Sequence, residues 1–145
     1  MRTRTITARK LAHYFEDWLG TAAASDEAVV HIIENGLPLK TVRRFLERGL
    51  SKDEVYGVVV NPRTLKHRRS RNQPLSREES ERAVRLARIL AQAQAVIGDE
   101  QAALTWLRTP KHRFGGRTPM DLISTEAGGR MVEQMLTQID EGIFA

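Results

Sequence analysis

Apolar residues recur every three or four positions along most of the chain, which is the spacing of amphipathic helices. The first such stripe lies in residues 6–19 and consists of Leu11, Tyr14, Phe15, Trp18 and Leu19. The strict alternation of apolar and polar residues that would indicate strands is nearly absent. The pattern therefore predicts an all-α fold.

Capping residues divide the next part of the chain into short helices. Ser25 is a predicted N-cap for a helix that ends at Asn35-Gly36. The following helix opens at Pro38, and Gly49 closes it. These signals predict short helices joined by short turns.

Two helices follow each other closely after residue 50. Ser51-Lys-Asp-Glu54 is a capping box, which starts a helix over residues 51–59. Asn61-Pro62 breaks this helix, because the residue before a proline is pushed out of helical conformation. Residues 63–69 form one more short helix, so a capped helix, a break and a second helix stand in series.

A second capping box, Ser76-Arg-Glu-Glu79, opens the longest predicted helix, residues 77–97. Its main apolar stripe consists of Ala83, Leu86, Ala87, Leu90, Ala93 and Ile97. Ile89 and Val96 widen this stripe, so that it can serve an internal core and a second surface together. The face over residues 83–97 is therefore our candidate contact for a dimer.

The last third of the chain carries further helix signals. Asp99 caps a helix that Pro110 follows, Thr118 starts another, and residues 126–141 form the last helix. One face of this last helix carries Met131, Val132, Met135, Leu136 and Ile139. We interpret this face as core, although methionine-rich faces also adapt to partners.

Composition places the chain among ordinary globular proteins. Of its 145 residues, 41% are hydrophobic and 28% are charged, which suits one domain or two small ones. It has no cysteine, so disulfides and cysteine-bound zinc are excluded. No apolar run approaches the ~20 residues that span a bilayer. We expect a soluble protein of the cytoplasm, without contact to a membrane.

Positive charge is concentrated in the first two thirds of the chain. The net charge is +5, with 18 Lys and Arg against 11 Asp and Glu in residues 1–97 but 5 against 7 in residues 98–145. Only the basic part is suited to a polyanion. This asymmetry suggests two tasks on one chain.

The basic block between residues 63 and 77 is the clearest candidate for a binding site. It contains Arg63, Lys66, His67, Arg68, Arg69, Arg71 and Arg77 and no acidic residue. The alternative is that this block is simply a solvated charged face. The basic side chains repel one another, however, and this clustering is unfavourable unless a polyanion is bound. The preceding pair of helices has the outline of a helix-turn-helix, whose second helix enters the major groove of DNA.

The sequence offers no catalytic or metal-binding template. His13, His31, His67 and His112 are scattered, and the acidic residues stand mainly at helix starts, where capping explains them. The Gly115-Gly116 pair lacks the spacing of a phosphate-binding loop. We expect neither an enzyme nor a bound cofactor or metal.

The C-terminal region combines aromatic residues with an apolar end. Trp106 and Phe114 lie in the acidic part, and the chain finishes with Gly142-Ile143-Phe144-Ala145. An apolar tail after a helix either folds back or inserts into another protein. Composition alone leaves both alternatives open.

Several motifs resemble a known family. Arg63-Thr-Leu-Lys-His-Arg-Arg69 and Leu75-Ser-Arg-Glu-Glu-Ser-Glu-Arg82 are similar to the DNA-binding part of Xre-type antitoxins. Trp106-Leu107, Phe114-Gly-Gly-Arg-Thr-Pro119 and Thr125-Glu-Ala-Gly128, in this order, resemble their C-terminal toxin-binding domain. The resemblance to the Xre/MbcA/ParS antitoxin family covers roughly residues 25–145.

The resemblance implies the antitoxin of a bacterial type II toxin–antitoxin module. Toxins of this family have a RES domain and destroy NAD⁺, and the antitoxin covers the entrance of the toxin's active site and represses its own operon. Operator contacts would fall on Arg63, Thr64, Lys66, His67, Arg68, Arg69 and Arg71. Toxin contacts would fall on Trp106, Phe114, Gly115, Gly116, Arg117, Gly142, Ile143, Phe144 and Ala145, with the tail as an inserted plug.

We therefore expect a helix-turn-helix portion (1–75), a connecting helix (76–97) and a small helical toxin-binding domain (98–145). Partners would be a RES-domain toxin and double-stranded operator DNA, bound by a homodimer with half-sites about 34 Å apart. A transcription regulator with a ligand-sensing C-terminal domain is the alternative. An RNA-binding protein fits less well, because the basic block lacks aromatic residues for base stacking.

Overall fold

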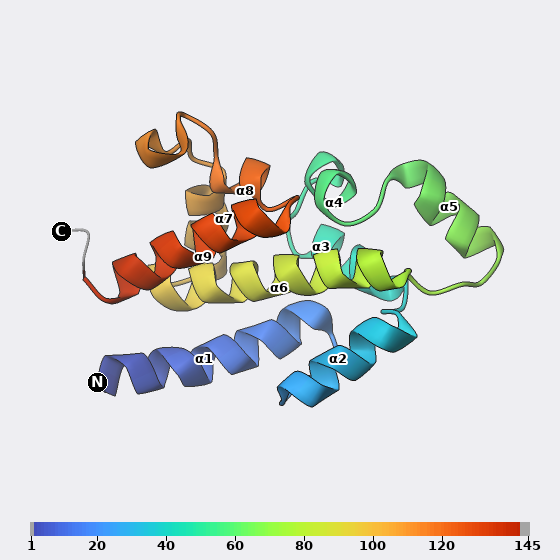
Figure 1. Cartoon of the computed structure of the whole chain (residues 1–145), viewed down its shortest axis with the longest axis horizontal. Coiled ribbons are helices and arrows are strands. Elements are labelled where there is room, and N and C mark those ends of the chain that lie inside the picture. The colour runs from blue at the N-terminus through green and yellow to red at the C-terminus, as the bar shows by residue number, and fades with distance from the viewer. Residues whose placement is uncertain (1, 143–145) are drawn as a thin grey trace.

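The computed structural model describes the backbone of residues 2–142 and the side chains of residues 9–142 (Figure 1). Over residues 2–142 the regular structure is helical throughout, so the expected all-α fold is confirmed. The helices are α1 (Arg2–Leu19), α2 (Asp26–Asn35), α3 (Lys40–Glu47), α4 (Lys52–Val58), α5 (Pro62–Ser70), α6 (Arg77–Ile97), α7 (Glu100–Leu107), the 3-10 helix η1 (His112–Phe114), α8 (Pro119–Leu122) and α9 (Glu126–Asp140). None of them has the length and apolar character needed to cross a membrane, as far as the described part extends.

Helix α6 forms the axis of the molecule. Helices α1 and α2 lie along one side of it, while α7 and α9 lie along the other (Figure 1). Leu86, Ile89 and Leu90 of α6 are completely buried between these layers. The Trp18 indole nitrogen of α1 donates a hydrogen bond to Gln94 of α6 at 3.0 Å. One hydrophobic core therefore joins helices from both ends of the sequence.

The broad apolar face of residues 83–97 is not available to a second copy. Ala83, Leu86, Ala87, Leu90 and Ala93 are each 0% exposed within the single chain. The stripe is wide because helices of the same chain cover α6 on two sides. The proposed dimer contact over residues 83–97 is therefore wrong, and a dimer would have to use another surface.

Most helix starts follow the capping signals in the sequence. Ser25, Ser51, Ser76, Asp99 and Thr118 each accept a backbone N–H of the first turn. Two starts differ by a few residues. Helix α3 begins at Lys40 rather than at Pro38. Pro62 is the first residue of α5 rather than part of a break, because proline suits the first helical turn.

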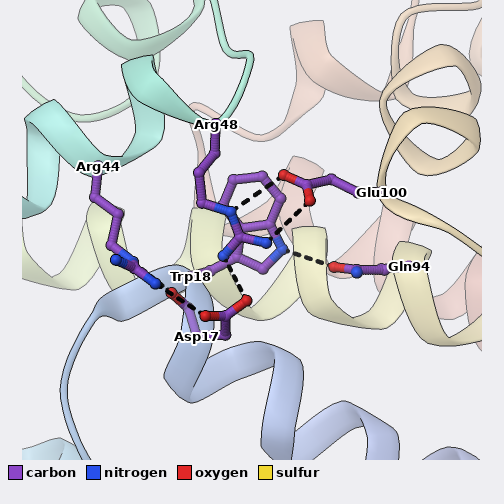
Figure 2. A network of polar contacts seen from close by, with 6 residues as sticks. All are labelled: Asp17, Trp18, Arg44, Arg48, Gln94 and Glu100. Carbon is purple, nitrogen blue, oxygen red and sulfur yellow. Dashed lines mark hydrogen bonds and ion pairs between the residues drawn. The ribbon is translucent and has the colours of Figure 1, made fainter.

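A polar network joins α1, the end of α3 and the start of α7 (Figure 2). The Arg48 guanidinium lies over the Trp18 ring at 4.0 Å from its centroid. The same group pairs with Asp17 at 2.8 Å and with Glu100 at 3.1 Å. Arg44 reaches the other carboxylate oxygen of Asp17 at 2.9 Å. This network fixes the end of α3 relative to the helices around it.

Helices α8 and α9 meet at a close backbone contact. Thr125 caps α9 by accepting the N–H of Gly128 at 3.0 Å. A Cβ atom on Gly128 would collide with the carbonyl oxygen of Leu122.

Met131 on α9 departs from the expectation, because it is 46% exposed rather than part of the core.

Candidate functional site

Helices α4 and α5 form the helix-turn-helix, with a turn of Val59, Val60 and Asn61 between them. Leu65 of α5 is 4% exposed and anchors the second helix to the core. The turn itself is held from α6, because the Arg82 guanidinium donates to the carbonyl oxygen of Val59 at 3.1 Å. Helix α5 is therefore fixed along one side only and presents its other side to solvent.

The N-terminus of α5 is capped locally. The Asn61 side-chain oxygen accepts the backbone N–H of Thr64 at 2.8 Å, and Pro62 follows as the first helical residue. The Thr64 side chain is half-buried beside this cap. Thr64 therefore lies at the edge of the exposed face of α5, and its predicted contact with DNA would be made from there.

Most of the predicted DNA-binding side chains are exposed and have no carboxylate partner. Arg63, Lys66, His67, Arg69 and Arg71 all lie on the surface. Within residues 9–142 none of these side chains forms an ion pair with a carboxylate. Arg77, at the start of α6, shares these two properties. The structure thus leaves a set of positive charges without neutralisation around α5.

Arg68 is the exception, since it has a carboxylate partner. Its guanidinium donates to Glu79 at 2.8 Å and 3.3 Å, and the Glu79 side chain is only 8% exposed. Burial alone would raise the pKa of Glu79, but bonds from Arg68 and the Ser76 backbone, together with the Arg68 charge, lower it overall. The expectation that the basic block has no neutralising partner is therefore wrong for Arg68, which joins α5 to the start of α6.

The glycine-containing loop at the predicted toxin-binding surface forms a closed turn. The Lys111 N–H donates to the Arg117 carbonyl oxygen, and the Gly116 N–H donates to the Lys111 carbonyl oxygen, both at 3.0 Å. Gly115 and Gly116 have φ angles of 66° and 85°, which favour glycine. The space around both is open, so they are needed for the turn rather than for packing. Arg117 is exposed beside them.

Trp106 lies in a surface groove at the end of α7. The Lys111 ammonium sits over its ring at 4.5 Å from the centroid, and burial lowers the pKa of Lys111. Ile97 and Ala102 supply the apolar part of the groove. Sequence reasoning included Trp106 but missed Lys111, which only the turn brings back over the indole.

Phe114 lines a second hollow, next to α9. Met131 and Met135 of α9 contribute its apolar lining, and Gln134 and Gln138 contribute polar groups. Sequence reasoning missed Met131 as a surface residue, because it adjoins the buried stripe of α9. The fully buried Val132 and Leu136 define the centre of that stripe and place Met131 on its edge.

The predicted tail is described only at its start. Gly142 has a φ of 74°, which ends α9 with a left-handed residue. Ile143, Phe144 and Ala145 lie outside the described residues. Among the side chains that are described, no three His, Asp or Glu residues form a group that could hold a metal ion.

The two candidate surfaces lie far apart on the molecule. Helix α5 projects at one end of the long axis, whereas the end of α9 lies at the other end (Figure 1). Such an arrangement leaves room for two macromolecules on one chain at the same time.

Comparison with known proteins matches two successive parts of the chain to family models. Residues 28–88 match the model of the Antitoxin Xre-like helix-turn-helix domain. Residues 92–142 match that of the Antitoxin Xre/MbcA/ParS C-terminal toxin-binding domain.

Several relatives are similar to this protein over most of the chain. A protein named Antitoxin Xre from Pseudomonas putida is 41% identical over 119 residues, covering 82% of this chain and 75% of the relative. One of the same name from Yersinia enterocolitica is 29% identical over 130 residues, with 88% of each chain covered. A Sphingobium protein named Prs ADP-ribosylating antitoxin is 29% identical over 127 residues, with 80% of each covered.

Proposed function

Because the chain belongs to the Xre antitoxin family and has its helix-turn-helix and toxin-binding domains, we propose that it neutralises a RES-domain toxin and represses its own operon. The toxin would degrade NAD⁺, and the antitoxin would cover the entrance to its active site. The antitoxin itself would act in the cytoplasm without catalysis or a cofactor.

The observation that carries the DNA-binding part is the set of unpaired cations around α5. On a helix with 3.6 residues per turn, positions 63, 67 and 70 lie about 140° to 160° around the axis from the buried Leu65, and position 66 lies about 100° from it. Arg63, Lys66 and His67 would therefore face the major groove, where arginine and lysine recognise guanine. Arg69 and Arg71 would bind phosphates, and Thr64 would contribute at the edge of the interface.

Arg68 requires a more limited role in this proposal. Its guanidinium already bonds with Glu79, so a direct base contact would have to break a partly buried ion pair. We therefore expect Arg68 to support the orientation of α5 rather than to recognise bases.

For the toxin-binding part, two hollows with aromatic residues supply the surface. The contacts would be Trp106, Phe114, Gly115, Gly116, Arg117, Gly142, Ile143, Phe144 and Ala145. The exposed Met131 extends this surface next to Phe114. The last four residues would enter the active site of the toxin as a plug.

The division of labour would follow residues 1–75 for DNA, 76–97 for the connecting helix and 98–145 for the toxin. A homodimer would present two α5 helices to half-sites about 34 Å apart. Because the apolar face of α6 is buried within each chain, the dimer contact would involve a different surface.

Binding to the protein's own promoter and protection from its toxin test the proposal together. The full chain should bind a promoter duplex better than a scrambled duplex of equal length. It should restore growth and NAD⁺ when coexpressed with the RES-domain protein that we expect to be encoded beside it. A chain ending at Glu141 should still bind DNA but lose protection, whereas Val30→Ser, at an exposed position on α2, should retain both.

The proposal fails if the full chain neither prefers its promoter nor associates with that neighbouring protein. Full protection by the shortened chain would refute the plug alone.

A further inference from the structure

Helix α7 is attached at both of its ends to the segment that leads into the helix-turn-helix. At its N-terminus, Glu100 receives two hydrogen bonds from Arg48, each at 3.1 Å. At its C-terminus, Arg108 bonds with Glu54 and with the carbonyl oxygen of Gly49. All three partners of α7 thus lie within residues 48–54, which lead into the first turn of α4.

The Arg108 contact has the geometry of a bidentate pair. Its Nε and one terminal nitrogen donate to the two Glu54 oxygens, both at 2.8 Å, and that nitrogen also donates to Gly49 at 2.7 Å. Burial alone would raise the pKa of Glu54, yet bonds from Arg108 and Ser51 and the Arg108 charge lower it. The same hydrogen bond raises the pKa of Arg108. Both shifts favour the charged pair.

Glu54 also completes the capping box of α4, whose N-cap is Ser51. Its carboxylate accepts the backbone N–H of Ser51 at 2.8 Å while the Ser51 hydroxyl accepts the N–H of Glu54. Arg108 therefore holds the first turn of α4 through the side chain that defines where this helix begins.

At the other end of α7, Arg48 has further contacts besides Glu100. Its guanidinium lies over the Trp18 ring and pairs with Asp17, both on α1 (Figure 2). Apart from these contacts, α4 is held by its buried Val55 and Val58 and, at its C-cap, by the hydrogen bond from Arg82 to the Val59 carbonyl oxygen. Only three residues, Val59 to Asn61, separate α4 from α5, so a tilt of α4 would displace the recognition helix.

We propose that Arg108 and Glu100, although they belong to the toxin-binding domain, are positioning residues for operator recognition. They hold residues 48–54 so that α4 and α5 enter the DNA in one orientation. This inference rests on the proposed repressor function. It also means that the helix-turn-helix depends on a helix outside its own domain.

Arg108→Gln and Glu54→Gln form a decisive pair of variants, because they change the net charge in opposite directions. Gln still serves in a capping box, so Glu54→Gln keeps the start of α4. The Arg108 side chain is 41% exposed, so its loss should leave the fold intact, as circular dichroism and melting would verify. Arg130→Gln, at an exposed and unpaired position on α9, removes the same charge as Arg108→Gln.

The measurement is the ratio of affinities for the promoter duplex and for a scrambled duplex of equal length. We expect this ratio to fall about tenfold in both Arg108→Gln and Glu54→Gln, which corresponds to misplacing one base contact. Arg108→Lys keeps the charge but not the bidentate bonds, and should give an intermediate ratio. Arg130→Gln should leave the ratio unchanged.

A purely electrostatic effect would change the affinities for the promoter and the scrambled duplex by the same factor. Both affinities would fall in Arg108→Gln and rise in Glu54→Gln. That result would overturn the inference. An unchanged ratio in folded Arg108→Gln and Glu54→Gln would do the same. If the wild-type chain itself shows no preference for its promoter, the repressor function fails, and the inference fails with it.

Discussion

At the scale of single residues, Gly128 shows how a motif can be structural rather than functional. The Thr-Glu-Ala-Gly motif combines the N-cap of α9 with a glycine that lies against the Leu122 carbonyl. The cap explains Thr125, and the close approach explains Gly128. Two of its four residues are thus accounted for by the joint between α8 and α9.

Replacing Gly128 with alanine should therefore destabilise the protein. The new Cβ would force apart two backbone segments, which costs about 2 kcal/mol in the free energy of unfolding. Gly57→Ala is the matched control, because Gly57 is helical and has open space around it. It should be neutral or stabilising by up to about 1 kcal/mol. Urea unfolding of both variants checks this, and equal stabilities would contradict it.

The Arg68–Glu79 pair predicts a stability that depends on pH. Folding lowers the pKa of Glu79 below its ordinary value of 4.5, so the pair stabilises the protein above that pH. This contribution is lost as the pH falls through the folded pKa. Arg68→Gln should cost about 2 kcal/mol at pH 7, and the difference from wild type should shrink below pH 4.5.

Arg77→Gln, which removes an exposed and unpaired cation, is the control for this experiment. It should leave the free energy of unfolding within about 0.5 kcal/mol of wild type at both pH values. If Arg68→Gln loses the same free energy of unfolding at both pH values, then Arg68 does not lower the pKa of Glu79.

The sequence predicts residues well where their signal is local. The capping residues were identified because a cap involves only three or four neighbouring positions. Arg68 was assigned to the free cations because its partner, Glu79, lies beyond the basic block and contacts it only after folding. Lys111 was missed for a similar reason, since its contact with Trp106 depends on a turn.

At the scale of elements, most of the positive charge of helix α5 is not paired with carboxylates of the described chain. Its buried side rests on Leu65 and the Arg68–Glu79 pair, while its exposed cations have no partner among the described side chains. If α5 binds DNA, each cation that contacts a phosphate contributes to the salt dependence of binding.

Lys66→Ala should thus weaken binding to the promoter. If Lys66 contacts a phosphate, the slope of log affinity against log salt should become shallower by about 0.9. If Lys66 contacts a base, the slope should stay the same while the preference for the promoter falls. Lys10→Ala, an exposed position on α1, is the control and should change neither. Lys66→Ala with wild-type slope and preference would exclude Lys66 from the interface.

The elements also show where helical periodicity is ambiguous. The pattern correctly identified α6 as a helix with a wide apolar face, but it could not tell whether the same chain or a second copy covers that face. In α9 the apolar stripe was one residue too wide, and Met131 lies at its solvent-exposed edge.

At the scale of the whole molecule, α6 extends through both matched domains. The sequence predicted the all-α class and the order of the two binding parts. It could not predict which helices pack together, because contacts such as Trp18 with Gln94 join positions 76 residues apart. The attachment of α7 to residues 48–54 was out of reach for the same reason.

The shared core has a consequence for how such genes can diversify. A recombination event that exchanged only the DNA-reading half would leave α1 of one lineage against an α6 surface tailored to another. Chimeras with a junction between residues 88 and 92 would therefore misfold more often than chimeras that carry α1 and α6 from one parent. New specificities should arise chiefly by replacement of exposed side chains, while the interior is inherited as one block.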